Sequence, residues 1–209
     1  MGPGALLRTR YRDGRGLAGL LAVVRDVTGT ARPRALAFAC ALRLTRAGVL
    51  PMTLEEEVVS DLFAEQAVLT GGVPALIRCA WETLVAGGVS EEVAYYTCVQ
   101  EMKQILDLMH AEGPAAMRAR TSGTAKFGGL TRGPRLISED VRTEMRRILE
   151  EVRDGRFARE WLDEHAAGAP RLQALEAEEA RHPMEDAGRR VRGALGGSGA
   201  GVDSPGAET

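Results

Sequence analysis

The chain becomes strongly helical at residues 53–72, which read TLEEEVVSDLFAEQAVLTGG. Thr53 and Glu56 form a T-x-x-E capping box, in which the two side chains accept hydrogen bonds from backbone N–H groups at the start of a helix. Apolar residues with helical spacing follow directly, at Val58, Val59, Leu62 and Phe63. We therefore predict that a helix begins here.

The residues before this helix have a different pattern. The apolar run of residues 20–24, LLAVV, lies between turn residues and indicates a buried strand. A helix is predicted from Pro33 to about Leu44, and a second short strand at residues 48–50. Two parallel strands are too few for an independent sheet, so we interpret residues 1–52 as the last β-α-β part of a larger domain.

After residue 53 the pattern is helical almost throughout. Further helices are predicted from Ser90 to about His110, from Ser138 to Gly155, and from Pro183 to Leu195. Residues 196–209 are rich in Gly, Ser and Pro, and we expect a disordered tail because they cannot bury enough apolar surface to fold. The expected fold is mainly α, with parts at 1–52, 53–195 and 196–209.

Charge and composition exclude several classes of function. Lys and Arg number 27 against 29 Asp and Glu, giving a formal net charge of -2, so no basic field attracts nucleic acid or an anionic membrane. No run approaches about 18 consecutive apolar residues, and we expect a soluble cytoplasmic protein. Three cysteines without C-x-x-C spacing are expected to be reduced core residues, and Trp81 and Trp161 to lie in the core.

Residues 14–19 read GRGLAG and match the dinucleotide-binding pattern G-x-G-x-x-G. In that fingerprint a strand precedes the glycines and a helix follows them, so that the helix N-terminus faces the pyrophosphate. Here a charged segment precedes the glycines and a predicted strand follows them. We interpret the motif as a turn before a strand.

Three acids, Glu57, Asp61 and Glu65, are spaced four residues apart and share one helix face. A solvated acidic face is one explanation. The other is that Asp61 and Glu65 bind magnesium, which takes oxygen ligands. The apolar residues around Asp61 and Glu65 favour the second explanation, because acids in apolar surroundings require a partner.

At these residues the sequence resembles the short-form ketol-acid reductoisomerases. Residues 61–72, DLFAEQAVLTGG, are similar to the magnesium-binding helix of that family. Further matches follow in family order at residues 2–4 (GPG), 14–16 (GRG), 45–49 (TRAGV), 81–85 (WETLV), 94–96 (AYY), 107–109 (DLM), 133–135 (GPR) and 160–161 (EW). The resemblance covers the chain from Gly2 to about Leu195.

The resemblance implies a knotted all-helical C-terminal domain, preceded by the end of a truncated Rossmann-type domain. It also implies an enzyme of valine and isoleucine biosynthesis that uses Mg²⁺ and NADPH, in which an alkyl group of an acetohydroxy acid migrates before reduction. By this resemblance Asp61 and Glu65 are metal ligands, and Ser122 contacts substrate. A second pair of ligands, at positions 97 and 101, comes from the partner subunit, so the family's chemistry implies a dimer.

The chain departs from the family pattern at the second pair of ligands. Glu101 is retained as a metal ligand, but Thr97 replaces a glutamate, and a neutral hydroxyl is a poor ligand for magnesium. Near Ser122, Arg120 and Lys126 replace a serine and a glutamate of the family. We expect the second metal to bind weakly or not at all.

A second departure concerns the cofactor. Family members carry a longer N-terminal part with the true Gly-rich phosphate loop. Met1 and Ala5 also stand where the family has a lysine and a histidine. We therefore expect no NADP(H) site in this chain.

These departures leave three hypotheses for the function. The first is a reductoisomerase that works only when another chain supplies the cofactor domain, and that is inactive alone. The second is a non-catalytic partner that forms a heterodimer with a full-length relative. A homodimer of this chain alone would count against this hypothesis. The third is a remnant without function.

Overall fold

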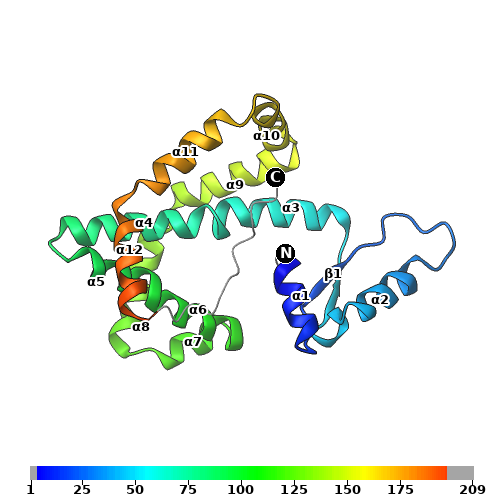
Figure 1. Cartoon of the computed structure of the whole chain (residues 1–209), viewed down its shortest axis with the longest axis horizontal. Helices are drawn as coiled ribbons and strands as arrows, with labels where there is room; N and C mark the ends of the chain where they lie inside the picture. Colours follow the sequence, from blue (N-terminus) through cyan, green and yellow to red (C-terminus); the bar gives the residue numbers. More distant parts are fainter. Residues whose placement is uncertain (1–3, 197–209) are drawn as a thin grey trace. The chain divides into compact units, whose positions relative to one another are not determined.

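The computed structural model of the protein describes residues 4–196, which divide into two compact units, residues 4–62 and 63–196 (Figure 1). Met1 lies outside the described residues, and so does the predicted tail except for its first residue, Gly196. The first unit contains α1 (Gly4–Arg12), β1 (Gly19–Leu21), α2 (Ala31–Ala41), the 3-10 turn η1 (Leu44–Arg46), β2 (Val49–Pro51) and most of α3 (Leu54–Ala64).

The predicted β-α-β arrangement is confirmed in the first unit. β1 and β2 are parallel, with Gly19 opposite Val49 and Leu21 opposite Pro51. The first strand is shorter than predicted, because its ladder ends where Met52 N–H donates to the Leu21 carbonyl at 3.0 Å. Val24, which the sequence places in the strand, is 74% exposed. Helix α1 has no counterpart among the predicted elements.

The second unit is entirely helical over its described residues. Its elements are the π-helical segment η2 (Glu65–Leu69), α4 (Gly72–Ala86), α5 (Glu91–Tyr95), a second π-helical segment η3 (Tyr96–Gln100), α6 (Glu101–Glu112), α7 (Pro114–Arg120), α8 (Gly123–Leu136), α9 (Glu139–Arg153), α10 (Arg156–Ala166), α11 (Pro170–Ala180) and α12 (Pro183–Ala194). The helices predicted near residues 90–110, 138–155 and 183–195 are all present, the first interrupted by η3.

The core of the second unit lies where α12 packs on α4 and α5. Its buried side chains are Trp81, Ala94, Tyr95, Ala187 and Val191. Trp81 is 4% exposed, and its indole N–H donates to the Glu91 carbonyl at 3.1 Å. This position confirms the prediction that Trp81 is a core residue, and the bond satisfies its polar atom.

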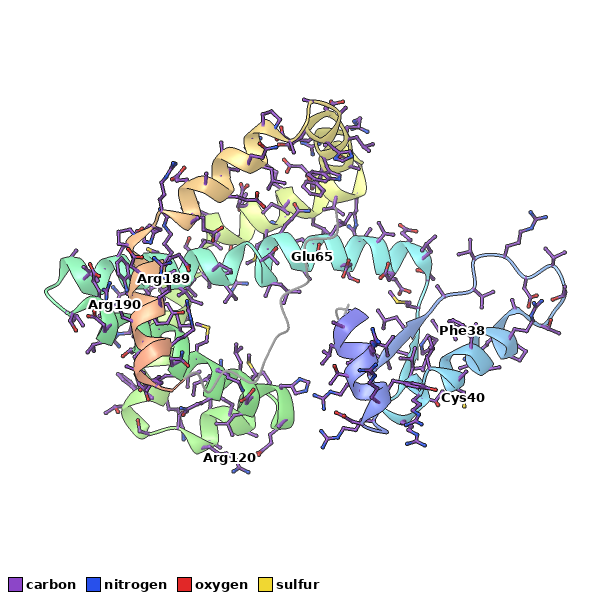
Figure 2. The ribbon with its side chains drawn as sticks, in the orientation of Figure 1. Phe38, Cys40, Glu65, Arg120, Arg189 and Arg190 are labelled. Atoms are coloured by element: carbon purple, nitrogen blue, oxygen red, sulfur yellow. The ribbon has the colours of Figure 1, made fainter. Side chains whose placement is uncertain are left out.

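The prediction that the cysteines are core residues is wrong. Cys40 and Cys79 are exposed, Cys98 is half-buried, and all three are free thiols. Cys40 and Phe38 project from α2 of the first unit (Figure 2). Their apolar neighbourhood in the sequence indicated burial, but α2 buries only Ala39.

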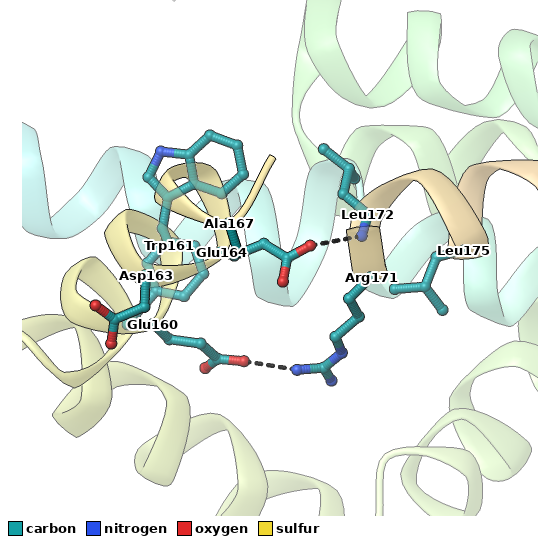
Figure 3. Close-up of a pocket in the computed structure, with 9 residues that line it drawn as sticks. Glu160, Trp161, Asp163, Glu164, Ala167, Arg171, Leu172 and Leu175 are labelled. Carbon is teal, nitrogen blue, oxygen red and sulfur yellow. Dashed lines mark hydrogen bonds and ion pairs between the residues drawn. The ribbon is translucent and has the colours of Figure 1, made fainter. Parts of the chain in front are cut away.

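The prediction that Trp161 is a core residue is also wrong. Trp161 is 45% exposed and stacks on His165, with ring centroids 5.7 Å apart. It lines an open cavity of about 480 Å³ between α10 and α11 (Figure 3). This hairpin is held by two polar contacts, from Arg171 Nη1 to Glu160 at 2.8 Å and from Leu172 N–H to Glu164 at 3.0 Å.

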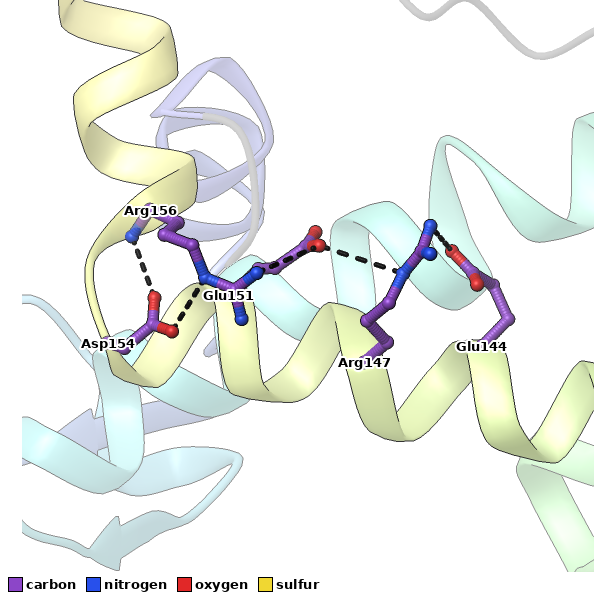
Figure 4. Close-up of polar contacts among 5 residues, drawn as sticks. All are labelled: Glu144, Arg147, Glu151, Asp154 and Arg156. Atoms are coloured by element: carbon purple, nitrogen blue, oxygen red, sulfur yellow. Dashed lines mark hydrogen bonds and ion pairs between the residues drawn. The ribbon is translucent and has the colours of Figure 1, made fainter.

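Ion pairs follow α9 into the corner that leads to α10 (Figure 4). Arg147 lies 2.9 Å from Glu144, and Arg156 lies 2.7 Å from Asp154 and 3.6 Å from Glu151. The Arg156 backbone N–H also donates to Asp154, and this bond is the main cause that lowers the pKa of Asp154. Exposed pairs contribute little individually, so these ion pairs alone do not define the corner, where Gly155 has a φ of +75°.

The continuous helical stretch Leu54–Ala86 contains an 18-residue window with a mean hydropathy of 1.2, and 6% of that window is buried. By length and composition it is able to cross a membrane. However, Asp61, Glu65 and Arg78 lie in this stretch, and a bilayer interior disfavours such side chains. A single stretch of this kind is weak evidence for a membrane span.

The predicted capping box is formed at the start of α3. Thr53 N–H donates to Glu56 Oε2 at 2.7 Å, and Glu56 N–H donates to Thr53 Oγ1 at 3.0 Å. The bond from Thr53 N–H is the main reason that the pKa of Glu56 lies below its ordinary value. This bond therefore stabilises the fold above the ordinary glutamate pKa, and the contribution is lost as pH falls through the lower folded-state pKa.

Replacing Thr53 with alanine tests the cap. Thr53→Ala removes the acceptor of the Glu56 N–H, and we expect the free energy of unfolding to fall by about 1 kcal/mol, the usual cost of losing an N-cap. Urea denaturation at pH 7 measures the change. Thr53→Ser keeps the hydroxyl and should match the wild type. Equal stability of Thr53→Ala and wild type would contradict the assignment.

Candidate functional site

Asp61 and Glu65 lie one helical turn apart. Asp61 belongs to α3 and is half-buried, whereas Glu65 is exposed and is the first residue of η2. Ala64, between them in the chain, has helical dihedral angles of φ -64° and ψ -39°, so the helix continues through the junction. The Glu65 carboxylate makes no hydrogen bond or ion pair within residues 4–196, and it is labelled in Figure 2. An unpaired carboxylate at this spacing is chemically suited to a hard cation.

The π-helical segment that starts at Glu65 was not predicted. The Glu65 carbonyl accepts from Thr70 N–H at 2.9 Å, Gly71 N–H at 3.1 Å and Thr70 Oγ1 at 2.8 Å. A Cβ on Gly71 would lie 2.0 Å from the Gln66 carbonyl oxygen, and one on Gly72 would lie 2.2 Å from that of Ala67. Only glycine, which has no Cβ, allows the backbone at positions 71 and 72 to lie this close to those carbonyl oxygens. The Thr-Gly-Gly sequence is thus the local signal for the segment.

A second π-helical segment contains the other pair of positions. Thr97 lies in η3, and Glu101 follows its last residue as the start of α6. Both side chains are exposed, and neither forms a side-chain hydrogen bond or ion pair among the described residues. Segments of this type are rare in α-helices and occur frequently at functional sites. One residue of each pair of positions thus lies in a π-helical segment, Glu65 in η2 and Thr97 in η3, and its companion lies in the adjoining α-helix.

One chain does not bring the predicted ligands together. Within residues 4–196, no group of three or more His, Cys, Asp or Glu side chains is close enough to hold a metal ion. Asp61 and Glu65 supply two oxygen donors, and Glu101 supplies a third from a different helix. These residue types fit magnesium, but further donors must come from water, substrate or another chain.

Next to Glu65, the side-chain amide nitrogen of Gln66 is buried and has no hydrogen-bond partner within the described residues. Buried donors are normally satisfied, so this nitrogen requires an acceptor. The sequence carried no signal for this feature.

Ser122 caps helix α8. Its Oγ accepts a hydrogen bond from Ala125 N–H at 3.2 Å and shares another with Thr124 Oγ1 at 3.0 Å. Nearby, Arg120 forms an ion pair with Glu112 at 2.7 Å. The Arg120 charge is therefore largely compensated, whereas the half-buried Lys126 has no such partner among the described residues.

The glycine-rich residues 14–19 form a turn between α1 and β1, as predicted. Gly14 has a φ of +73°, and its carbonyl accepts from Arg46 Nη1 at 2.5 Å. A Cβ on Gly16 would lie 2.3 Å from the Arg43 carbonyl oxygen. The glycines therefore serve the packing of η1 against this turn, and a helix lies before them in place of the strand that a phosphate loop requires.

Comparison with known proteins identifies the family. Residues 54–196 match the ketol-acid reductoisomerase C-terminal domain, and residues 1–48 match the NADPH-binding domain of acetohydroxy acid isomeroreductase. The chain belongs to the ketol-acid reductoisomerase family. It is also similar to the solved structure of an NADH-preferring ketol-acid reductoisomerase from an uncultured archean, with 40% sequence identity and a TM-score of 0.86.

The match to that ketol-acid reductoisomerase covers 92% of this chain and 58% of the relative, so the chain spans less than two thirds of the relative's length. Ketol-acid reductoisomerases are oligomeric, use Mg²⁺ and NAD(P)H, and belong to branched-chain amino-acid biosynthesis. The resemblance in the sequence is confirmed, together with the mainly helical fold and its short β-α-β start.

Substitution of Gly16 tests the structural role of the glycine motif. Gly16→Ala places a methyl group against the Arg43 carbonyl, and we expect a loss of about 1 to 3 kcal/mol, as for other overpacked sites. Gly4→Ala is the matched control, because a Cβ there meets nothing within 4 Å. Thermal unfolding measures both variants. A Gly16→Ala variant as stable as Gly4→Ala would contradict the packing role.

Proposed function

We propose that the chain supplies the metal- and substrate-binding half of a ketol-acid reductoisomerase site, completed by a second chain. Asp61 and Glu65 would bind magnesium for one site, and Glu101 would contribute to the site of the partner. The observation that carries this proposal is that Glu65 begins one π-helical segment and Glu101 directly follows the other. Both carboxylates are unpaired within the described residues.

Exposed apolar side chains just after Glu65 support the involvement of a second chain. Val68, Leu69 and Leu76 are between 43% and 58% exposed. A groove of about 400 Å³, lined mainly by apolar residues of η2, α4 and α9, lies on the same segment. Covering this surface would add the apolar burial that a single chain lacks.

When bound, magnesium would supply Lewis-acid polarisation of the oxygens of an acetohydroxy acid. Asp61 and Glu65 would hold the cation from adjacent turns of one helix. Ser122, at the N-terminus of α8, would present its hydroxyl where the partial positive charge of the helix favours an anionic group. Thr97 offers no charge to a cation, so we propose that the site using positions 97 and 101 is the weaker one.

Reduction of the substrate requires a bound nicotinamide. In this chain Arg46 donates to the Gly14 carbonyl of the glycine turn, and Arg43 donates to the Tyr11 carbonyl just before it. The match to the NADPH-binding domain covers residues 1–48. We therefore propose that NAD(P)H is not held by the glycine turn of these residues, and that the cofactor is supplied from outside residues 4–196.

A non-catalytic role is the second candidate. A chain that keeps Asp61 and Glu65 but carries Thr97 would support one site of a heterodimer and weaken the other. The exposed apolar face at Val68 and Leu76 favours a protein partner for either role. Isolation of a heterodimer of this chain with a full-length reductoisomerase, in which one site is active and the other is inactive, would support this candidate.

Titration with magnesium tests the metal assignment. Outer-shell partners of a metal contribute about 10- to 100-fold in affinity, so a direct carboxylate ligand should contribute at least as much. We expect weak binding by the wild type and at least about tenfold tighter binding by Thr97→Glu in isothermal titration calorimetry. Thr97→Gln, which adds length without charge, is the control. Absence of binding by both wild type and Thr97→Glu would overturn the assignment.

A further inference from the structure

Gly188, in the middle of α12, packs directly against the ring of Tyr95. It is buried, and a Cβ added to it would lie 2.7 Å from Cε2 and Cζ of Tyr95. Its backbone is not in the left-handed region that favours glycine. Glycine is a poor residue for a helix interior, so the close approach of the Tyr95 ring is what requires it here.

The Tyr95 side chain is held by α12 on more than one side. It is 7% exposed, and its hydroxyl accepts a hydrogen bond from Arg192 Nη1 at 2.7 Å. The Arg192 guanidinium lies 5.9 Å from the ring centroid. Ala187 and Val191 complete the packing from α12. The ring therefore has a defined position in both packing and hydrogen bonding.

Polar contacts fix α12 at its two ends. Arg190 donates to Glu92 and to Glu91, each at 2.6 Å, and so joins α12 to the first turn of α5. His182, just before α12, lies 3.0 Å from Glu82 of α4. Helix α12 is thus anchored to the helices on either side of the turn between α4 and α5 (Figure 1).

Tyr95 is the residue directly before η3. Helix α5 has only five residues, so the position of Tyr95 sets the direction in which η3 begins. A π-helical segment is less favourable than continued α-helix and persists where its surroundings hold it. Thr97 and Glu101, the second pair of the proposed site, lie two and six residues further on.

We propose that α12 is a positioning element for positions 97 and 101, with Gly188 and Arg192 as positioning residues that act through Tyr95. Neither residue offers a donor to a cation. Their contribution is to hold the Tyr95 ring so that η3 keeps its π-helical form and presents positions 97 and 101 together. This inference rests on the proposed metal-binding function.

Magnesium affinity in the Thr97→Glu background provides the test. Adding Gly188→Ala should displace the Tyr95 ring and weaken binding by about tenfold or more, as for other residues that position metal ligands. Gly193→Ala in the same helix is the matched control, because a Cβ there meets nothing within 4 Å, and it should leave the affinity unchanged. Titrations are carried out well below the unfolding midpoint of each variant.

A purely structural role would lower the unfolding midpoint of Gly188→Ala without changing its magnesium affinity, and that result would overturn the inference. If Gly188→Ala does not fold, Tyr95→Phe decides, because it keeps the ring and removes only the bond to Arg192. It should bind magnesium several-fold more weakly than the background, as expected on losing one outer-shell contact. Unchanged affinity would again overturn the inference.

Hydrogen exchange tests whether α12 positions η3, independently of whether the chain binds magnesium. Amides of residues 96–101 should exchange faster in Gly188→Ala than in Gly193→Ala, with or without magnesium. If Thr97→Glu does not bind magnesium, the metal assignment fails, and the exchange rates alone then decide whether α12 positions η3. Equal exchange in the two variants would show that it does not.

Discussion

The contact of α12 with Trp81 and Tyr95 is the packing interaction on which the helical unit depends. The buried side chains of α4, α5 and α12 meet there in one cluster, and eight apolar residues in all are buried among the described residues. Small residues on α12 make this possible, because Ala187 and Gly188 let the helix approach the aromatic rings closely. Polar groups at the periphery, including Arg192 on the Tyr95 hydroxyl, then fix the orientation of the helix.

The candidate site is incomplete in one chain. Asp61 and Glu65 are supplied by the helix that begins at the capping box, whereas Glu101 follows a π-helical segment next to Tyr95. The same chain leaves an exposed apolar face at Val68, Leu69 and Leu76. A second chain would supply the missing metal ligands and cover this face at once, which is why family membership and the unpaired carboxylates of this chain support the same proposal.

The sequence predicted the features that depend on local interactions. The capping box, the β-α-β start and the main helix boundaries were recognisable because each is specified by neighbouring residues. The burial of Cys40 and Trp161 was wrongly predicted, because burial depends on which helices pack together. The π-helical segments were missed because their only sequence signal is the Thr-Gly-Gly after the first, and the second depends on packing from α12. The carboxylate roles came from resemblance to the family, since spacing alone favoured a solvated acidic face.

Mixing two complementary variants tests the shared site most directly. One chain carries Thr97→Glu with Asp61→Asn and Glu65→Gln, and the other keeps Asp61, Glu65 and Thr97 but carries Glu101→Gln. Each alone should bind magnesium weakly, because neither combines both pairs. After the two chains are unfolded and refolded together, a mixed pair has one site with all four carboxylates, so calorimetry should show strong magnesium binding by the mixture. Binding by the mixture no stronger than by the separate chains would contradict a site shared between chains.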